Sequence, residues 1–429
     1  MDKHMVATAV VVLLCLTPAW ASDWPGFRGP GGTGVCDEVN LPTTWSETEN
    51  LQWKQPLPGP GSSSPIVSGD RLFVTCYSGY GTDRRNPGQP GDLKRHLLCI
   101  NAVDGTVIWQ RSADAVLPED PYRGYISEHG YASSTPVTDG QRVYVFFGKS
   151  GVLAFDLEGN QLWQKALGTE SSNRRWGSGA SPILYKNLLI VNASEESRTL
   201  IALDKITGEE VWKVEADKTE LSFSTPVIVT LADGRDELVI VVPGEVWAFA
   251  PETGQLNWYA RTTLTGNISP TPVAADGVLY AFGGFPSTEA VAIRAGGQDD
   301  VTDTHIVWRS RDASYVPSPV VHQGRLYWVS DTGRAYGADG QTGKVLYNEK
   351  LPTRGMGKPF YASVVLADGK LYAVSRTAGT FVLAPKPQFE QLAHNRFESD
   401  ESDFNASPAV SGGRIFLRSN QFLYCVALD

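Results

Sequence analysis

The residues best suited to acid–base chemistry in this chain are Glu128 and His129, adjacent in the segment Ser127-Glu128-His129-Gly130-Tyr131. The chain has only six histidines. A carboxylate beside an imidazole can transfer a proton or help to hold a metal ion. The same pair is common as a hydrogen-bonded structural plug, so the sequence leaves both roles open.

Cationic and aromatic residues accompany this pair in two long insertions, Tyr77 to His96 and Ser112 to Tyr131. Loops that exceed the length of a simple connection often carry binding residues, and cations attract carboxylates. We therefore predict a binding face for an anionic or carboxylate-bearing ligand, although solvated loop charges would give the same pattern. The predicted face comprises Arg84, Arg85, Arg95, His96, Arg123, Glu128, His129, Tyr131, Arg175, Trp176, Arg354 and Lys358.

The overall charge limits the classes of partner. The 429 residues carry a formal net charge of −10, which argues against binding duplex nucleic acid. No phosphate-binding loop, Ser–His–Asp arrangement or metal-ligand spacing is present in the sequence, so we predict no metal site.

The N-terminus has the pattern of an export signal over residues 1–21. Lys3 and His4 precede an apolar run from Met5 to Leu16, and Ala19-Trp20-Ala21 forms a small-x-small cleavage site. The run is too short to span a bilayer, and no other segment is a candidate transmembrane helix. Leu14 before Cys15 does not favour a lipoprotein. We expect an exported protein, periplasmic or extracellular.

Four cysteines remain after this signal, Cys36, Cys76, Cys99 and Cys425. An even number in an oxidising compartment permits disulfides. Cys76 and Cys99 fall on neighbouring predicted strands and form the favoured pair. Four buried thiols are the competing interpretation.

Two repeated sequence motifs, which we call the first and second phrase, indicate the elements that position these residues. In the first phrase, Ser or Thr is followed by Pro and a β-branched residue. In the second phrase, an apolar strand leads into a turn with Asp and Gly, and a further strand ends in Trp. The first phrase recurs about every 45 residues, which predicts eight four-stranded units. Its anchor residues are Ser64, Thr135, Ser181, Thr225, Thr271, Ser318, Ser363 and Ser407, with Val in place of Pro after Ser363.

Four-stranded antiparallel units of this length are typical of a β-propeller. We predict an all-β, eight-bladed propeller over residues 50–429, preceded by an irregular arm at 22–49. The last unit lacks its fourth strand, and the orphan strand Leu51 to Leu57 supplies it, so the two chain ends close the ring and remove exposed sheet edges. We expect a monomer.

Bulky residues on the outer strands are predicted to fill the gaps between wedge-shaped blades. Burying one indole contributes about 2–3 kcal/mol. The docking residues are Trp53, Trp109, Trp163, Trp212, Trp258 and Trp308, with Tyr347 as a substitute.

The phrase formed by Ala202, Asp204, Thr207, Gly208 and Trp212 resembles the docking motif of the pyrroloquinoline-quinone-type (PQQ-like) propeller repeat. That family contains quinoprotein dehydrogenases and cofactor-free scaffolds of the BamB type. The segments Trp24 to Pro30 and Ser127 to Ser134 also resemble secreted propellers of planctomycete-type bacteria.

The dehydrogenases of this family use adjacent cysteines against the quinone and a Glu, Asn and Asp set for calcium. This chain has no adjacent cysteines, and the calcium set cannot be mapped onto it. The resemblance therefore favours the non-dehydrogenase branch, without cofactor. We expect a binding or scaffold propeller for an envelope protein, a peptide or an anionic glycan. The alternative is a PQQ-dependent dehydrogenase or another envelope enzyme using Glu128 and His129.

Overall fold

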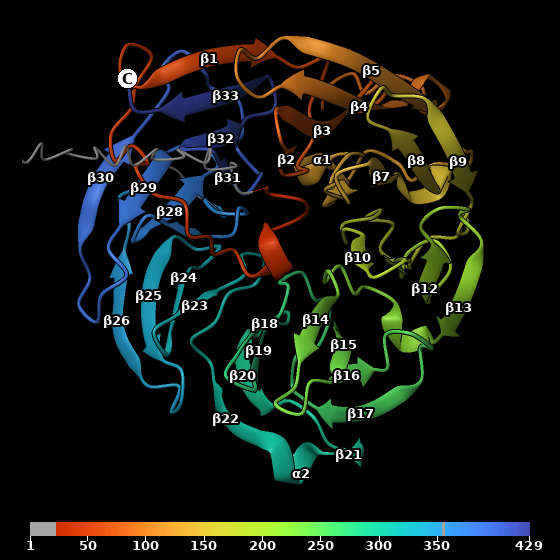
Figure 1. Cartoon of the computed structure of the whole chain (residues 1–429), viewed down its shortest axis with the longest axis vertical. Coiled ribbons are helices and arrows are strands. Elements are labelled where there is room, and N and C mark those ends of the chain that lie inside the picture. Colours follow the sequence, from red (N-terminus) through yellow and green to blue (C-terminus); the bar gives the residue numbers. More distant parts are fainter. Residues whose placement is uncertain (1–22, 354–356) are drawn as a thin grey trace, which may run out of the picture.

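The computed structural model describes residues 23–353 and 357–429, and these form a ring of eight β-sheets (Figure 1). The predicted all-β, eight-bladed propeller of antiparallel blades is confirmed. The predicted export signal lies outside the described residues. In each sheet the first strand lies nearest the centre and the last lies on the rim (Figure 1).

The first blade contains β2 (Ile66–Ser68), β3 (Arg71–Ser78), β4 (Lys94–Asn101) and β5 (Val107–Asp114), and the second contains β6 (Val137–Thr138), β7 (Arg142–Phe146), β8 (Val152–Asp156) and β9 (Gln161–Lys165). The third blade contains β10 (Ile183–Tyr185), β11 (Leu188–Ala193), β12 (Thr199–Asp204) and β13 (Glu210–Glu215). The fourth blade contains β14 (Val227–Thr230), β15 (Asp236–Val242), β16 (Glu245–Phe249) and β17 (Leu256–Arg261). A short β21 (Asp299–Asp300) adds to the outer edge of β17 in parallel, and α2 (Thr302–His305) follows it.

The fifth blade contains β18 (Val273–Ala275), β19 (Val278–Gly283), β20 (Glu289–Arg294) and β22 (Ile306–Ser310), and the sixth contains β23 (Val320–His322), β24 (Arg325–Val329), β25 (Arg334–Asp339) and β26 (Val345–Lys350). The seventh blade contains β27 (Val365–Ala367), β28 (Lys370–Ser375), β29 (Gly379–Leu383) and β30 (Gln391–Asn395). The eighth blade contains β31 (Ala409–Ser411), β32 (Arg414–Arg418), β33 (Phe422–Ala427) and β1 (Leu51–Pro56). Strand β1 pairs antiparallel with β33, so the N-terminal strand completes the last blade as predicted.

Burial along the strands reflects how the blades pack. The middle strands, such as β11, are buried on both faces because blades pack face to face, whereas the outer β13 alternates between buried and exposed residues. The turn into β13 is held by the Asp204 carboxylate, which accepts from the backbone N–H groups of Ile206 and Thr207. Gly208 then adopts a φ of 74°, which favours glycine.

Five of the six predicted docking tryptophans donate an indole hydrogen bond to a carbonyl of the next blade. The pairs are Trp53 with Ala102, Trp109 with Leu157, Trp163 with Lys205, Trp212 with Pro251, and Trp308 with Gly340. Trp258 is fully buried in the cluster shared by the fourth and fifth blades, and it donates instead to Glu237 of its own blade at 2.8 Å.

The arm before β1 crosses the end of the ring that carries the turns between first and second strands. Trp24 exchanges two backbone hydrogen bonds with Val67, and Cys36 N donates to Leu366 O. The short helix η1 (Pro30–Gly32) lies at the centre of the ring (Figure 1). Arg28 is fully buried beside η1 and donates to the carbonyls of Thr33 and Pro319, and burial lowers its pKa to about 9.

The favoured disulfide is not present. Cys36, Cys76, Cys99 and Cys425 are all free thiols, and Cys36 is only half-buried. In the register of β3 and β4, Cys76 lies opposite His96 and Cys99 lies opposite Phe73. Because of this offset the two sulfurs belong to different hydrophobic clusters and cannot meet.

Candidate functional site

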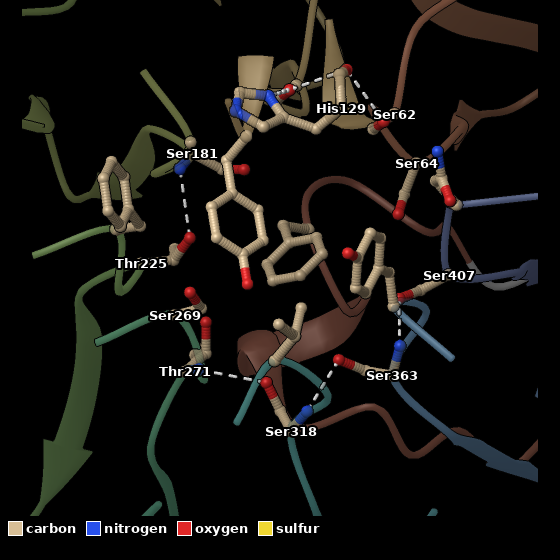
Figure 2. Close-up of a pocket in the computed structure, with 18 of the residues that line it drawn as sticks. Ser62, Ser64, His129, Ser181, Thr225, Ser269, Thr271, Ser318, Ser363 and Ser407 are labelled. Atoms are coloured by element: carbon tan, nitrogen blue, oxygen red, sulfur yellow. Dashed lines mark hydrogen bonds between the residues drawn. The ribbon is translucent and has the colours of Figure 1, made fainter. Parts of the chain in front are cut away.

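A cavity of about 170 Å³ lies on the ring axis, and we call it the central cavity. Most of its wall is built from the residues just before the first strand of each blade. Seven of the eight Ser/Thr anchors line it, and Figure 2 shows most of them arranged around the opening. Phe27 of the arm also lines the cavity. The anchors therefore lie at the axis, as expected for one position repeated in every blade.

The anchors hydrogen-bond to one another around the axis, and six of the eight backbone N–H groups donate to the hydroxyl of the anchor in the next blade. The bonds form two arcs with distances of 2.9–3.0 Å. One arc runs through Ser64, Thr135, Ser181 and Thr225, and the other runs through Thr271, Ser318, Ser363 and Ser407. Among the described residues, the Ser64 and Thr271 hydroxyls that begin the arcs have no hydrogen-bond partner.

Helix α1 (Ile126–His129) places His129 above the anchors, at the end of the ring opposite the arm. The helix stops at Gly130, whose φ is 75°. A side chain at this position would lie 2.2 Å from the Tyr77 ring, so only glycine fits. Tyr77 thus fixes the turn that aims His129 at the axis.

Both ring nitrogens of His129 are occupied. Nε2 lies 2.9 Å from the Trp176 carbonyl oxygen, and Nδ1 lies 2.6 Å from Ser133 Oγ. Because a carbonyl only accepts, Nε2 carries the proton and Nδ1 accepts from Ser133. Burial lowers the pKa of His129 to about 4, so the imidazole is neutral at pH 7 and is too weak a base to activate Ser133 efficiently.

The Glu128 carboxylate pairs with two arginines rather than with the His129 ring. It lies 2.6 Å from Arg84 and 2.9 Å from Arg376, and Arg376 also pairs with Asp403. Burial opposes ionisation, but these hydrogen bonds and charges hold the pKa of Glu128 below its usual value. Asn405 of the last blade donates to the Glu128 carbonyl, so α1 is fastened across the ring.

A second, wider cavity of about 990 Å³ opens above the central cavity, and we call it the vestibule. The two share Tyr125, Glu128, His129, Trp176 and Tyr361. The vestibule lies on the end of the ring formed by the long loops 79–93 and 115–136, which we call the long-loop face. These loops lie beside each other, as Tyr122 N donating to Tyr80 Oη shows.

The residues of the predicted binding face differ in their exposure to solvent. Arg84, Arg85, Arg123 and Arg175 are exposed, whereas Glu128, His129, Trp176 and Lys358 are half-buried. Lys358 pairs with Asp331 at 3.3 Å. Arg354 lies outside the described residues.

For three residues the prediction of a place on the binding face is wrong, because their side chains are buried. Arg95 and His96 lie within strand β4 and are buried, with exposed fractions of 3% and 5%. Arg95 pairs with Glu119 at 2.5 Å, and His96 hydrogen-bonds to Ser78 and Ser112. Tyr131 packs among tyrosines beneath the loops. The sequence placed Arg95 and His96 in a loop because the strand starts earlier than the polar residues suggest.

A buried polar network anchors the 115–136 loop to the second and third blades. Asp120 pairs with Lys149 at 3.4 Å, and Ser172 donates to Glu195 at 2.5 Å. The neighbouring Glu196 accepts from Ser178, while its Oε2 has no partner among the described residues. Burial, aided by nearby carboxylates, raises the pKa of Glu195 to about 8 and that of Glu196 to about 7.

The central cavity does not fit pyrroloquinoline quinone. The quinone carries several carboxylates, and among the described residues no lysine or arginine lines this cavity. The one lining carboxylate that could hold calcium, Glu128, is already paired with two arginines. Within the described part of the chain, no group of three or more His, Cys, Asp or Glu side chains has metal-binding geometry.

The repeat pattern predicts the anchors, but a second residue of each repeat that lines the cavity was not predicted. The residue two positions before every anchor also lines the cavity, because alternate residues of an extended strand face the same side. These residues are Ser62, Ser133, Gly179, Phe223, Ser269, Val316, Tyr361 and Asn405. The repeat period combined with strand alternation was the available signal. Arg376 has no such signal, since it reaches the site from a loop.

Curated relatives of similar length are outer membrane protein assembly factors BamB. The Yersinia pestis protein is 26% identical over 344 residues, covering 76% of this chain and 78% of that protein. The Burkholderia pseudomallei protein is 25% identical, with 68% and 82% covered. A polyvinylalcohol dehydrogenase from a Pseudomonas species is 22% identical, with 71% and 50% covered. Among the described residues, no helix has the length and apolar character needed to cross a membrane.

Solved structures show the same fold. BamB from Moraxella catarrhalis superposes with a TM-score of 0.61 at 14% identity, covering 88% of this chain and 97% of that one. A europium-containing methanol dehydrogenase gives 0.52 at 12%, with 85% and 89% covered. The family model described as "Outer membrane protein assembly factor BamB" matches residues 20–177, 132–299 and 299–382. Because these matches together reach from residue 20 to residue 382, the chain belongs to that family.

Proposed function

We propose that this protein is a protein-binding scaffold of the cell envelope and that its long-loop face is the docking surface. Membership of the assembly-factor family and the predicted export signal support an envelope scaffold. The observation that carries the choice of face is the vestibule of about 990 Å³, the largest cavity described there. Gly124 and Trp176 line it, and the exposed Arg123 and Arg175 are their neighbours in the chain.

The exposed arginines of the long-loop face indicate the charge of the partner. Arg85, Arg123, Arg174 and Arg175 are exposed on this face, and none forms an ion pair within the described residues. The chain as a whole is acidic, so four unpaired cations near one opening create a local attraction for carboxylates. The partner segment is therefore acidic. An anionic glycan is the competing ligand with the same charge.

Charge reversal tests the docking surface. The probe is a labelled polyglutamate peptide, with an oligogalacturonate as the glycan arm, each measured by fluorescence anisotropy at low and high salt. R85E/R123E/R175E should weaken peptide binding about tenfold or more, and salt should remove the difference. The control R235E/R294E/K344E carries the same charge change on exposed residues of the opposite end of the ring and should bind normally. Equal losses in both variants, or binding of the glycan alone, would refute the proposal.

The enzyme alternative receives less support from the geometry. Glu128 is neutralised by two arginines, and His129 is a neutral group with both nitrogens bonded. Adding pyrroloquinoline quinone and calcium to the purified protein should leave its absorbance and Tm unchanged. A quinone absorbance band together with a raised Tm would restore the dehydrogenase interpretation.

A further inference from the structure

We propose that the central cavity binds a neutral hexose ring, either as a free monosaccharide or as the terminal unit of a glycan. This site is distinct from the protein-docking surface, because its lining chemistry is neutral where the vestibule is charged. The inference concerns a small ligand and stands whether or not an acidic protein binds above it.

The wall of the cavity selects against charge. The anchors are all Ser or Thr, and the residues two positions before them are Ser, Gly, Phe, Val, Tyr or Asn. His129 is neutral, and Glu128 at the opening is matched by Arg84 and Arg376. A charged ligand would lose its hydration without gaining a counter-ion, which is costly. A neutral ligand meets no such penalty.

Several hydroxyls are available for such a ligand. Ser269 and Tyr361 donate no hydrogen bond to another described residue, and both are partly accessible from the cavity. Ser62 donates to the His129 carbonyl and keeps an acceptor site free. Figure 2 shows Ser62 and Ser269 on opposite sides of the opening. Hydroxyls spread around the cavity match a ligand with several polar groups better than one with a single hydroxyl.

Aromatic rings supply the remaining contact surface. Trp176, Phe223 and Tyr361 line the cavity together with Tyr125 and Tyr315. Trp176 packs edge-on against Tyr125 at 4.6 Å between ring centroids, and Arg376 lies 4.5 Å from the Tyr361 centroid. The rings are thus fixed before a ligand arrives. Apolar faces of this kind cover the C–H faces of a pyranose while hydroxyls orient it.

The cavity is closed at one end and reached from the other. Phe27 and the arm fill the end opposite α1, and the vestibule shares five lining residues with the cavity. At about 170 Å³ the central cavity is much larger than the space that one water molecule needs, so it has room for a small ring. A glycan chain would leave through the vestibule.

The test uses calorimetry and ligand-observed NMR with the mature chain. The probes are glucose, methyl glucoside, maltose, glucuronate and phenol. The neutral sugars should bind, and glucuronate should bind at least tenfold more weakly. Maltose binding tighter than glucose would identify a terminal glycan unit, and equal affinity would identify a free sugar. Failure of every neutral sugar at tens of millimolar, or preference for glucuronate or phenol, would overturn the proposal.

Matched variants locate the site. Tyr361→Phe and Ser269→Ala should each weaken sugar binding about fivefold, as expected for one lost neutral hydrogen bond. Tyr327→Phe removes a buried hydroxyl that has no partner among the described residues and lies outside the cavity, so it should bind normally. Circular dichroism melting confirms that all three are folded. Unchanged affinity in both cavity variants would exclude this cavity as the site.

Discussion

The indole of Trp212 in the third blade lies directly on Gly254 in the turn of the fourth blade. A Cβ at Gly254 would be 2.6 Å from the indole Cε3, and Trp212 Nε1 donates to the Pro251 carbonyl at 3.0 Å. The same contact joins Trp53 to Gly105, Trp109 to Gly159, Trp163 to Gly208 and Trp308 to Gly343. The repeat motif is therefore an inter-blade joint, in which the glycine of one blade makes room for the tryptophan of the preceding one.

Gly254→Ala should destabilise the protein by about 2–4 kcal/mol, because it adds both a steric clash and a positive-φ penalty. Gly244→Ala provides the matched control. Gly244 has a φ of 84° but no atom within 4 Å of its Cβ position, so only about 1 kcal/mol should be lost. Urea unfolding measures both. Equal losses would show that the indole contact contributes nothing.

The anchor hydroxyls give a second matched pair. Ser363→Ala removes the acceptor of Ser318 N and should cost about 1–3 kcal/mol. Ser64→Ala removes a hydroxyl that has no partner among the described residues, so it should change stability by less than about 0.5 kcal/mol. Thermal unfolding of the two variants, followed by circular dichroism, tests the arcs. A larger loss for Ser64→Ala would contradict them.

Ring closure depends on strand β1. A chain of residues 59–429 lacks both the arm and β1, so it should unfold at lower temperature. Because the edge of β33 is then unpaired, it should also associate. A peptide covering residues 50–58, added in trans, should restore the monomer in size-exclusion chromatography, whereas a scrambled peptide should not. A monomeric, fully stable 59–429 chain would disprove the need for closure.

Glu196 should make the protein less stable at and above pH 7 than at pH 4.5. Burial raises its pKa from 4.5 to about 7 in the folded state, so folding favours the protonated form and stability falls as the pH rises from about 4.5 to about 7. Relative to the native protein, Glu196→Gln should gain on the order of 2–3 kcal/mol between pH 5 and pH 9. The exposed Glu349→Gln should show no such trend in urea midpoints.

His129 should have the opposite effect over nearly the same pH range. Its pKa falls from 6.5 to about 4 on folding, so the unfolded chain binds the proton first and stability is lost as the pH drops from 6.5 towards 4. His129→Gln cannot be protonated and should flatten this part of the stability profile. His322→Gln, outside the site, should leave the slope unchanged. An unaltered slope in His129→Gln would place the acid sensitivity elsewhere.

The architecture could be predicted because it is encoded locally and repeatedly. Each hairpin is specified by residues a few positions apart, such as Asp204, Gly208 and Trp212, and repetition reveals the blade count. The closure by β1 followed from counting strands. The neutral lining of the axis could also have been predicted, because the position of a residue in the repeat determines its distance from the ring axis.

The site itself was decided by tertiary structure. Glu128 meets Arg376 and Asn405 only because α1 is folded across the axis, and no local pattern connects residues so far apart in the chain. Arg95 and Cys76 illustrate the same limit, because strand ends and register decide which side chains are buried and which can meet. The sequence by itself determined the ring and its period. Only the folded chain determined which loops reach the axis, because long-range contacts depend on how the blades pack.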